Sequence, residues 1–164
     1  MPEGKFVEVV DENDCVIGKI ERKKVHQKPT LHRSVHVWVF NSAGKIFLQK
    51  RPRTMKQCPS LWDSSAGEHC ETGETIEQTA HRGLKEELGI KVTHLEYAGR
   101  KAILDGTCFE FIHLFRIVFD GKITPDMREL AGGKFFSMKE AKELVKKGET
   151  TPFFAQLFRE YMHE

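Results

Sequence analysis

The segment from Gly67 to Ile90 reads GEHCETGETIEQTAHRGLKEELGI, and its pattern decides the fold. Apolar side chains recur in its second half every four residues, at Ile76, Ala80, Leu84 and Leu88. This spacing predicts a helix that buries one face. Carboxylates gather beside that face, where Glu87 directly follows Glu86. Like charges this close cost stability, so we expect a divalent cation to neutralise them.

Both ends of this predicted helix are marked in the sequence. Thr75, followed by Gln78, is the pattern of a capping box, which binds the first free backbone N–H groups of a helix. Gly89 tolerates the left-handed conformation with which many helices end. We therefore expect the helix to begin at about residue 75 and to stop at Gly89.

These residues resemble the Nudix box of the Nudix hydrolases, G-x5-E-x7-R-E-U-x-E-E-x-G-U, in which U is a bulky aliphatic residue. Seven of the nine fixed positions match, namely Glu74, Arg82, Leu84, Glu86, Glu87, Gly89 and Ile90. Glu68 replaces the first box glycine, and Gly83 replaces the glutamate after the arginine. The resemblance implies an α+β protein with a Nudix-type α/β/α sandwich and a mixed sheet. It also implies hydrolysis of a diphosphate linkage with Mg²⁺ or Mn²⁺ as cofactor.

The resemblance also assigns roles to individual residues. Glu86 and Glu87 are the leading metal ligands, and the main-chain carbonyl of Gly67 or Glu68 lies near the same ion. Arg82 orients Glu86 through a charge-assisted bond, as the box arginine does in relatives, and Glu74 helps to fix the loop. The alternative is an exposed helix face laced by salt bridges.

The replacement of the box glutamate by Gly83 removes a carboxylate that binds metal or helps to activate water in many relatives. Glycine also costs about 1 kcal/mol relative to alanine inside a helix. We hypothesise that Glu68 or Glu71 supplies the lost carboxylate from the loop. The rival interpretation is drift towards inactivity.

Composition limits the other classes of function. The chain has 164 residues, of which 39% are hydrophobic and 30% charged, as expected for one compact domain. No apolar run approaches the roughly 18 residues of a membrane span, and a net charge of +2 with mixed signs gives no nucleic-acid footprint. Its cysteines lie far apart and nothing resembles a secretory leader, so a reducing cytoplasm is expected. The oligomeric state is open, with a homodimer as one option.

The rest of the chain reads as strands with a few helices. Alternating or β-branched segments predict an N-terminal hairpin (6–10 and 15–20), a second hairpin (35–40 and 45–49) and strands at 62–66, 95–104 and 108–119. Helices are predicted from Ser137 to about Lys147 and from Thr151 onwards. We interpret residues 1–164 as one domain, with a hairpin extension (1–30), the box (67–90) and C-terminal helices (137–164).

Within the superfamily, the arrangement is similar to the isopentenyl diphosphate isomerase branch, which also carries a hairpin before the Nudix core. The likeness covers most of residues 5–140 and includes counterparts of His32, Trp38, Phe40, Asn41, Gly44, Trp62, Gly67, Gly73 and Glu74. The isomerases need a cysteine where this chain has Ala66, and they carry a histidine where it has Glu68. Isomerisation is therefore the least favoured activity. Glu110 aligns with the isomerase's acidic partner.

Several residues outside the box are candidates for substrate binding, and each could instead have a purely structural or surface role. Arg51 and Arg53 lie in a basic loop suited to phosphate oxygens, although solvated surface charge is an equal option. His32 binds metal or phosphate, or is an ordinary strand histidine. Trp62 walls the pocket or packs in the core. Glu110 serves the site or forms a structural ion pair, and Glu129 is interpreted as a surface residue.

The sequence thus predicts a Mg²⁺-dependent hydrolase that cleaves a small-molecule diphosphate, either a nucleoside diphosphate derivative or a related organic diphosphate. A catalytically weak protein that binds phosphate ligands is the first alternative, and an isopentenyl diphosphate isomerase is the second.

Overall fold

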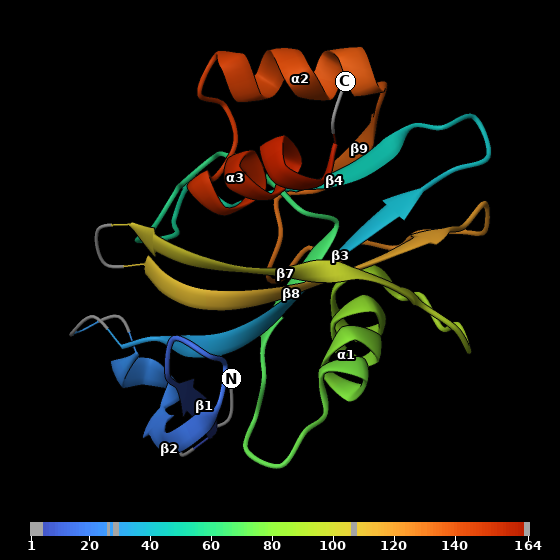
Figure 1. Cartoon of the computed structure of the whole chain (residues 1–164). Coiled ribbons are helices and arrows are strands. Elements are labelled where there is room, and N and C mark those ends of the chain that lie inside the picture. Colours follow the sequence, from blue (N-terminus) through green and yellow to red (C-terminus); the bar gives the residue numbers. More distant parts are fainter. Residues whose placement is uncertain (1–4, 26, 28–29, 106–107, 163–164) are drawn as a thin grey trace.

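The computed structural model describes residues 5–25, 27, 30–105 and 108–162 (Figure 1). Parts of the predicted hairpin extension and the last two residues of the predicted C-terminal helices lie outside this range. The elements follow in the order β1 (Phe6–Val10), β2 (Val16–Glu21), the 3₁₀ turn η1 (Arg22–Lys24), β3 (His32–Phe40), β4 (Ile46–Lys50), β5 (Trp62–Asp63), β6 (Ala66–His69), α1 (Ile76–Leu88), β7 (Glu96–Asp105), β8 (Cys108–Val118), β9 (Gly133–Phe136), α2 (Met138–Lys146) and α3 (Pro152–Tyr161).

Strand β3 organises a mixed sheet. It pairs antiparallel with β4 and β6 and parallel with β8, which in turn pairs antiparallel with β7. The parallel register runs from His32 opposite Glu110 to Phe40 opposite Val118. Because directly paired residues project to the same side of a sheet, this register brings the side chains of His32 and Glu110 together.

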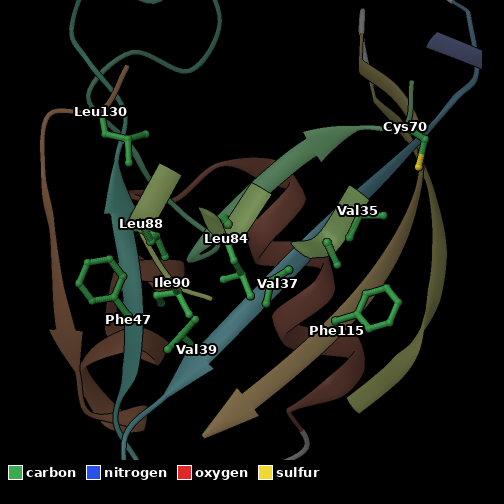
Figure 2. Close-up of a cluster of buried hydrophobic side chains, with 12 residues drawn as sticks. Val35, Val37, Val39, Phe47, Cys70, Leu84, Leu88, Ile90, Phe115 and Leu130 are labelled. Atoms are coloured by element: carbon green, nitrogen blue, oxygen red, sulfur yellow. The ribbon is translucent and has the colours of Figure 1, made fainter. Parts of the chain in front are cut away.

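Helices cover both faces of the sheet, with α1 on one side and α2 and α3 on the other (Figure 1). Alternate residues of β3 supply the two cores. Val35, Val37 and Val39 pack with Leu84 and Leu88 of α1, as Figure 2 shows. On the opposite face Trp38 packs against Phe154 and Phe158 of α3. The predicted α/β/α sandwich with a mixed sheet is confirmed.

The local signals in the sequence set the ends of α1. Thr75 Oγ1 accepts a hydrogen bond from the Gln78 backbone at 3.1 Å, and the Gln78 side chain accepts one from the Thr75 backbone at 2.9 Å. Gly89 closes the helix at φ +66°, where a side chain would be strained. In the described part of the chain no helix is long and apolar enough to cross a membrane.

The predicted N-terminal hairpin is confirmed as β1 and β2. The single strand predicted over residues 62–66 is wrong, because the chain changes partners there. β5 pairs with β4, whereas β6 pairs with β3. Between them Ser65 Oγ accepts a hydrogen bond from the Val39 backbone N–H at 2.8 Å, which stands in for a ladder bond at the switch. This switch aims β6 towards the end of α1.

Candidate functional site

A cavity of about 910 Å³ opens where the sheet, the last turn of α1 and the loops 51–57 and 128–130 meet. Its acidic lining residues come from five different segments of the chain, and they are Asp63, Glu68, Glu87, Glu110 and Glu129. Basic residues also line it, namely Arg22, Lys23, Arg51, Lys56 and Arg128. The cavity therefore contains several carboxylates, which suit cations, and also guanidinium and ammonium groups, which suit phosphates.

Glu87 projects from α1 to the floor of this cavity and is only 4% exposed. Its Oε1 accepts hydrogen bonds from Gln49 Nε2 at 2.8 Å and from the Gly67 backbone N–H at 3.3 Å. Its Oε2 is buried without a hydrogen-bond partner. Burial and the neighbouring Glu68 raise the pKa of Glu87 well above its ordinary value. A carboxylate oxygen that is buried beside a second acid and lacks a donor fits a divalent cation.

Glu68 projects from β6 into the same region and is 8% exposed. Arg22 Nη2 lies 3.5 Å from its Oε1, and Arg82 Nη1 lies 3.5 Å from its Oε2. Burial raises the pKa of Glu68, and these two arginines counter the rise. Two buried carboxylates from α1 and β6 thus share one end of the cavity.

Arg82 ties α1 to the loop that precedes it. Its guanidinium donates to the two carboxylate oxygens of Glu74 at 2.7 and 3.0 Å and to the His69 carbonyl at 2.9 Å. Glu86 Oε2 lies farther away, 3.6 Å from Nη1. Glu74 also accepts a hydrogen bond from the Glu71 backbone N–H at 3.0 Å. The arginine therefore anchors Glu74 more tightly than it orients Glu86.

A second group of ligating side chains lies in the same part of the fold. His32 Nε2 is 3.3 Å from His69 Nε2, and Glu110 Oε2 lies 3.9 Å from each of these nitrogens. A 2.8 Å contact between His32 Nδ1 and the Thr30 carbonyl orients the His32 ring. Although burial opposes the charge, the bond from His69 and the nearby His32 hold the pKa of Glu110 far below its usual range. Two imidazoles and a carboxylate are ligands that zinc and similar metals take.

The family model described as the NUDIX domain matches residues 30–158. The chain belongs to the Nudix family. Isopentenyl-diphosphate Delta-isomerase 2 of Photorhabdus laumondii is 33% identical over 144 residues, which cover 84% of this chain and 80% of the relative. An uncharacterized Nudix hydrolase of Listeria monocytogenes is 31% identical over 159 residues, which cover 90% of this chain and 88% of the relative. The crystal structure of DR0079 from Deinococcus radiodurans superposes with a TM-score of 0.84 at 22% identity, covering 96% of this chain and 99% of that one.

The two adjacent glutamates of the Nudix box, Glu86 and Glu87, differ in their surroundings. Glu87 is buried in the cavity, whereas the side chain of Glu86 is 48% exposed and is not among the cavity-lining residues. Glu71, predicted as a metal ligand, also lies outside the lining. Lys5 Nζ lies 2.7 Å from its Oε2 and holds it on the hairpin side of the loop. Gly67 lines the cavity, with the His36 ring close to its backbone.

The predicted substrate-binding residues divide in the same way. Arg51 lines the cavity, held by the Gln57 carbonyl at 3.0 Å and by Asp63 at 3.6 Å. Arg53 is exposed and lies outside the lining. Trp62 also lies outside it, because its ring packs against Phe136 at a centroid distance of 4.8 Å. The core alternative thus describes its position.

The cavity-lining residues that sequence reasoning missed include Arg22, Gln49, His69 and Arg128. His69 faces His32 only because β6 pairs with β3 in a register that sets Ser34 opposite His69. Arg22 arrives from η1 and Glu129 from the loop before β9, both far away in sequence. Local sequence patterns do not indicate such long-range contacts. Glu129, interpreted as a surface residue, is exposed and also lines the cavity.

Proposed function

We propose that this protein hydrolyses a diphosphate linkage in a nucleoside diphosphate derivative or a related organic diphosphate, with Mg²⁺ or Mn²⁺ as cofactor. The observation that carries the proposal is the unpartnered Glu87 Oε2, which is buried beside Glu68 in a cavity that also presents cationic side chains. Membership in the Nudix family, with hydrolases among its relatives, supports this reaction class.

The residues present fit such an ion. Glu87 would hold it from α1 and Glu68 from β6, with the Gly67 carbonyl near by and Glu86 reaching from the exposed side of the helix. A bound Mg²⁺ supplies charge to nonbridging phosphate oxygens and acidity to a coordinated water. Gln49 and the Gly67 N–H keep one oxygen of Glu87 fixed, so the other is held in place for the metal.

The cationic residues of the cavity suit the phosphates of the substrate. Asp63 and the Gln57 carbonyl hold the Arg51 guanidinium, so little side-chain entropy is lost when it binds an anion. Lys56 of the same loop adds positive charge, as do Arg22 and Arg128 from two other segments. A cavity of about 910 Å³ falls within the usual range for small-molecule sites.

Two alternatives differ from hydrolysis in that neither releases phosphate. A phosphate-ligand binding protein would bind the diphosphate without cleaving it. An isomerase would shift a double bond without releasing phosphate, and Ala66 carries no thiol where the resemblance puts the isomerase's cysteine. The test still includes this alternative, because a relative that is 33% identical in sequence to this chain is named as an isomerase.

The test measures metal-stimulated phosphate release from a panel of nucleoside diphosphate derivatives, nucleotide sugars, dinucleotides and prenyl diphosphates. We expect turnover with at least one member in Mg²⁺ or Mn²⁺ and a loss of more than about 100-fold in Glu87→Gln. Glu77→Gln, an exposed change on the same helix, is the matched control and should leave turnover unchanged. Tight binding without phosphate release would overturn the proposal in favour of a binding protein, and double-bond migration would overturn it in favour of an isomerase.

A further inference from the structure

Gly83 lies in the interior of α1 and faces β6. A Cβ atom built on it would lie 3.2 Å from Glu68 Cγ and 3.5 Å from Glu87 Oε2. The first distance is shorter than nine in ten real Cβ contacts. Because glycine costs about 1 kcal/mol in a helix interior, the position forgoes helix stability. The structure shows what occupies the vacated space, which is the side chain of Glu68.

The pairing of β6 explains why Glu68 points there. Glu68 lies opposite Val35 in the antiparallel register with β3, and Val35 packs in the core beneath α1. Paired residues share a face of the sheet, so Glu68 is directed at the same helix. There its carboxylate adjoins that of Glu87, whose pKa it helps to raise.

Glu71 is the other loop acid that could replace the box glutamate, and its surroundings argue against it. Its carboxylate is bound by Lys5 at 2.7 Å, on the side of the loop that meets the N-terminal hairpin. Glu68 lines the cavity and Glu71 does not. Of the two candidates, only Glu68 shares the cavity with Glu87.

We propose that Glu68 and Gly83 are an exchanged pair, in which strand β6 supplies to the metal site the carboxylate that the Nudix box places on the helix. In the box the first of these positions is glycine and the second is glutamate, so the two residue types have changed places. Gly83 makes room for Glu68, and Glu68 acts with Glu87 on the same divalent ion. This inference rests on the proposed function, since it names a further ligand of that metal.

Mn²⁺ binding to the full chain, followed by electron paramagnetic resonance, tests the exchange without relying on turnover. Glu68→Gln should weaken Mn²⁺ binding at least tenfold while the thermal midpoint is retained. Glu68→Gly should weaken it similarly. Gly83→Glu alone should lower the thermal midpoint, because its Cβ would lie 3.2 Å from Glu68 Cγ and force that side chain to shift. The double variant Glu68→Gly with Gly83→Glu should recover Mn²⁺ affinity to within about threefold of wild type.

Glu77→Gln, on the exposed side of α1, is the control for the loss of one negative charge and should bind Mn²⁺ as wild type does. Wild-type affinity in Glu68→Gln, or a double variant that binds no better than Glu68→Gly, would overturn the exchange. A larger loss in Glu71→Gln than in Glu68→Gln would overturn it too. If the double variant does not fold, Glu68→Gln decides alone.

Failure of the proposed function gives a different result. Mn²⁺ would then bind to wild type and be lost in Glu68→Gln, while no member of the substrate panel released phosphate. That outcome upholds the exchange and removes only the hydrolysis. A wild-type chain that binds no Mn²⁺ overturns both.

Discussion

Gln49 Nε2 donates a 2.8 Å hydrogen bond to Glu87 Oε1, so the centre of the sheet and the last turn of α1 meet at one carboxylate. The same amide nitrogen donates to the Ser65 carbonyl at 3.1 Å. The amide thereby fixes which oxygen of Glu87 faces the cavity. An uncharged residue of β4 thus becomes part of the proposed metal site through its partner.

Replacement of Gln49 by methionine tests this positioning role. Gln49→Met keeps the side-chain volume but removes the donor, and we expect Mn²⁺ affinity to fall by about 10-fold, as for other residues that orient a metal ligand. Titration with Mn²⁺ measures the change, and Gln49→Glu, which adds a charge but no donor, should not restore the affinity. Unchanged affinity in Gln49→Met would show that the Gln49 amide is not needed to orient the Glu87 carboxylate.

Arg82 should be important for stability as well as for the site. Its side chain is 17% exposed and makes two bonds to Glu74. Arg82→Gln leaves this carboxylate without its charged partner, so we expect the free energy of unfolding to fall by about 2–4 kcal/mol in urea. Arg128→Gln, at a side chain that is 90% exposed, should leave the free energy of unfolding almost unchanged. Equal losses in the two variants would contradict the assignment.

The aromatic core beneath α3 offers a test of the second layer. Phe154 is fully buried and its ring lies 5.5 Å from that of Trp38. Phe154→Ala removes a large buried ring and should lower the free energy of unfolding by about 3–5 kcal/mol. Val118→Ala, at a side chain that is 64% exposed, should stay within about 0.5 kcal/mol of wild type.

The turn of the first hairpin is joined to β8 by a buried pair whose stability depends on pH. Asp14 Oδ2 lies 2.6 Å from His113 Nε2, and the Tyr97 hydroxyl lies 2.9 Å from Nδ1. Burial lowers the pKa of His113 from 6.5, helped by Arg33 and Arg100 and opposed by Asp14.

Because the folded-state pKa lies below that of the unfolded chain, the unfolded chain takes up the proton first as the pH falls. The contribution of His113 to stability is therefore complete above about pH 6.5 and declines as the pH falls through the folded-state pKa. Unfolding in urea between about pH 8 and pH 5 measures this slope. His113→Gln should flatten it, and a slope unchanged by the substitution would assign it to other groups.

The group of His32, His69 and Glu110 predicts a preference for a softer cation than Mg²⁺. We expect Co²⁺ to bind there and to give visible absorption typical of nitrogen ligands. His69→Gln should abolish this absorption, whereas Glu87→Gln should retain it. Loss of the absorption in both variants would mean that the histidine group and Glu87 bind the same ion.

Local patterns in the sequence are sufficient for much of this fold. The apolar stripe, capping box and terminal glycine of α1 act within a few residues of one another, and the structure places each as expected. The same holds for the N-terminal hairpin and for β8. Each of these elements is determined by contacts between residues that lie close together in the sequence.

The cavity depends on contacts between residues that lie far apart in the sequence. His69 meets His32 through the register of β6, and Glu110 meets it through a parallel pairing across more than 70 residues. Trp62 belongs to the core because the Phe136 ring, from another segment, covers it. The motif identified Glu87 and Glu68 as acids of interest, but Glu68 and Glu71 are distinguished only by contacts in the folded chain, with Gly83 beside Glu68 and Lys5 beside Glu71.

The hairpin that precedes the Nudix core ends in η1, where Arg22 contacts Glu68. The segment matched by the family model begins only at residue 30. Anyone who trims the protein to that segment before assaying it would delete a guanidinium from the pocket and leave Glu68 with Arg82 as its sole basic neighbour within 4.0 Å among the described residues. Substrate screens and vector designs should therefore keep everything from Lys5 onward.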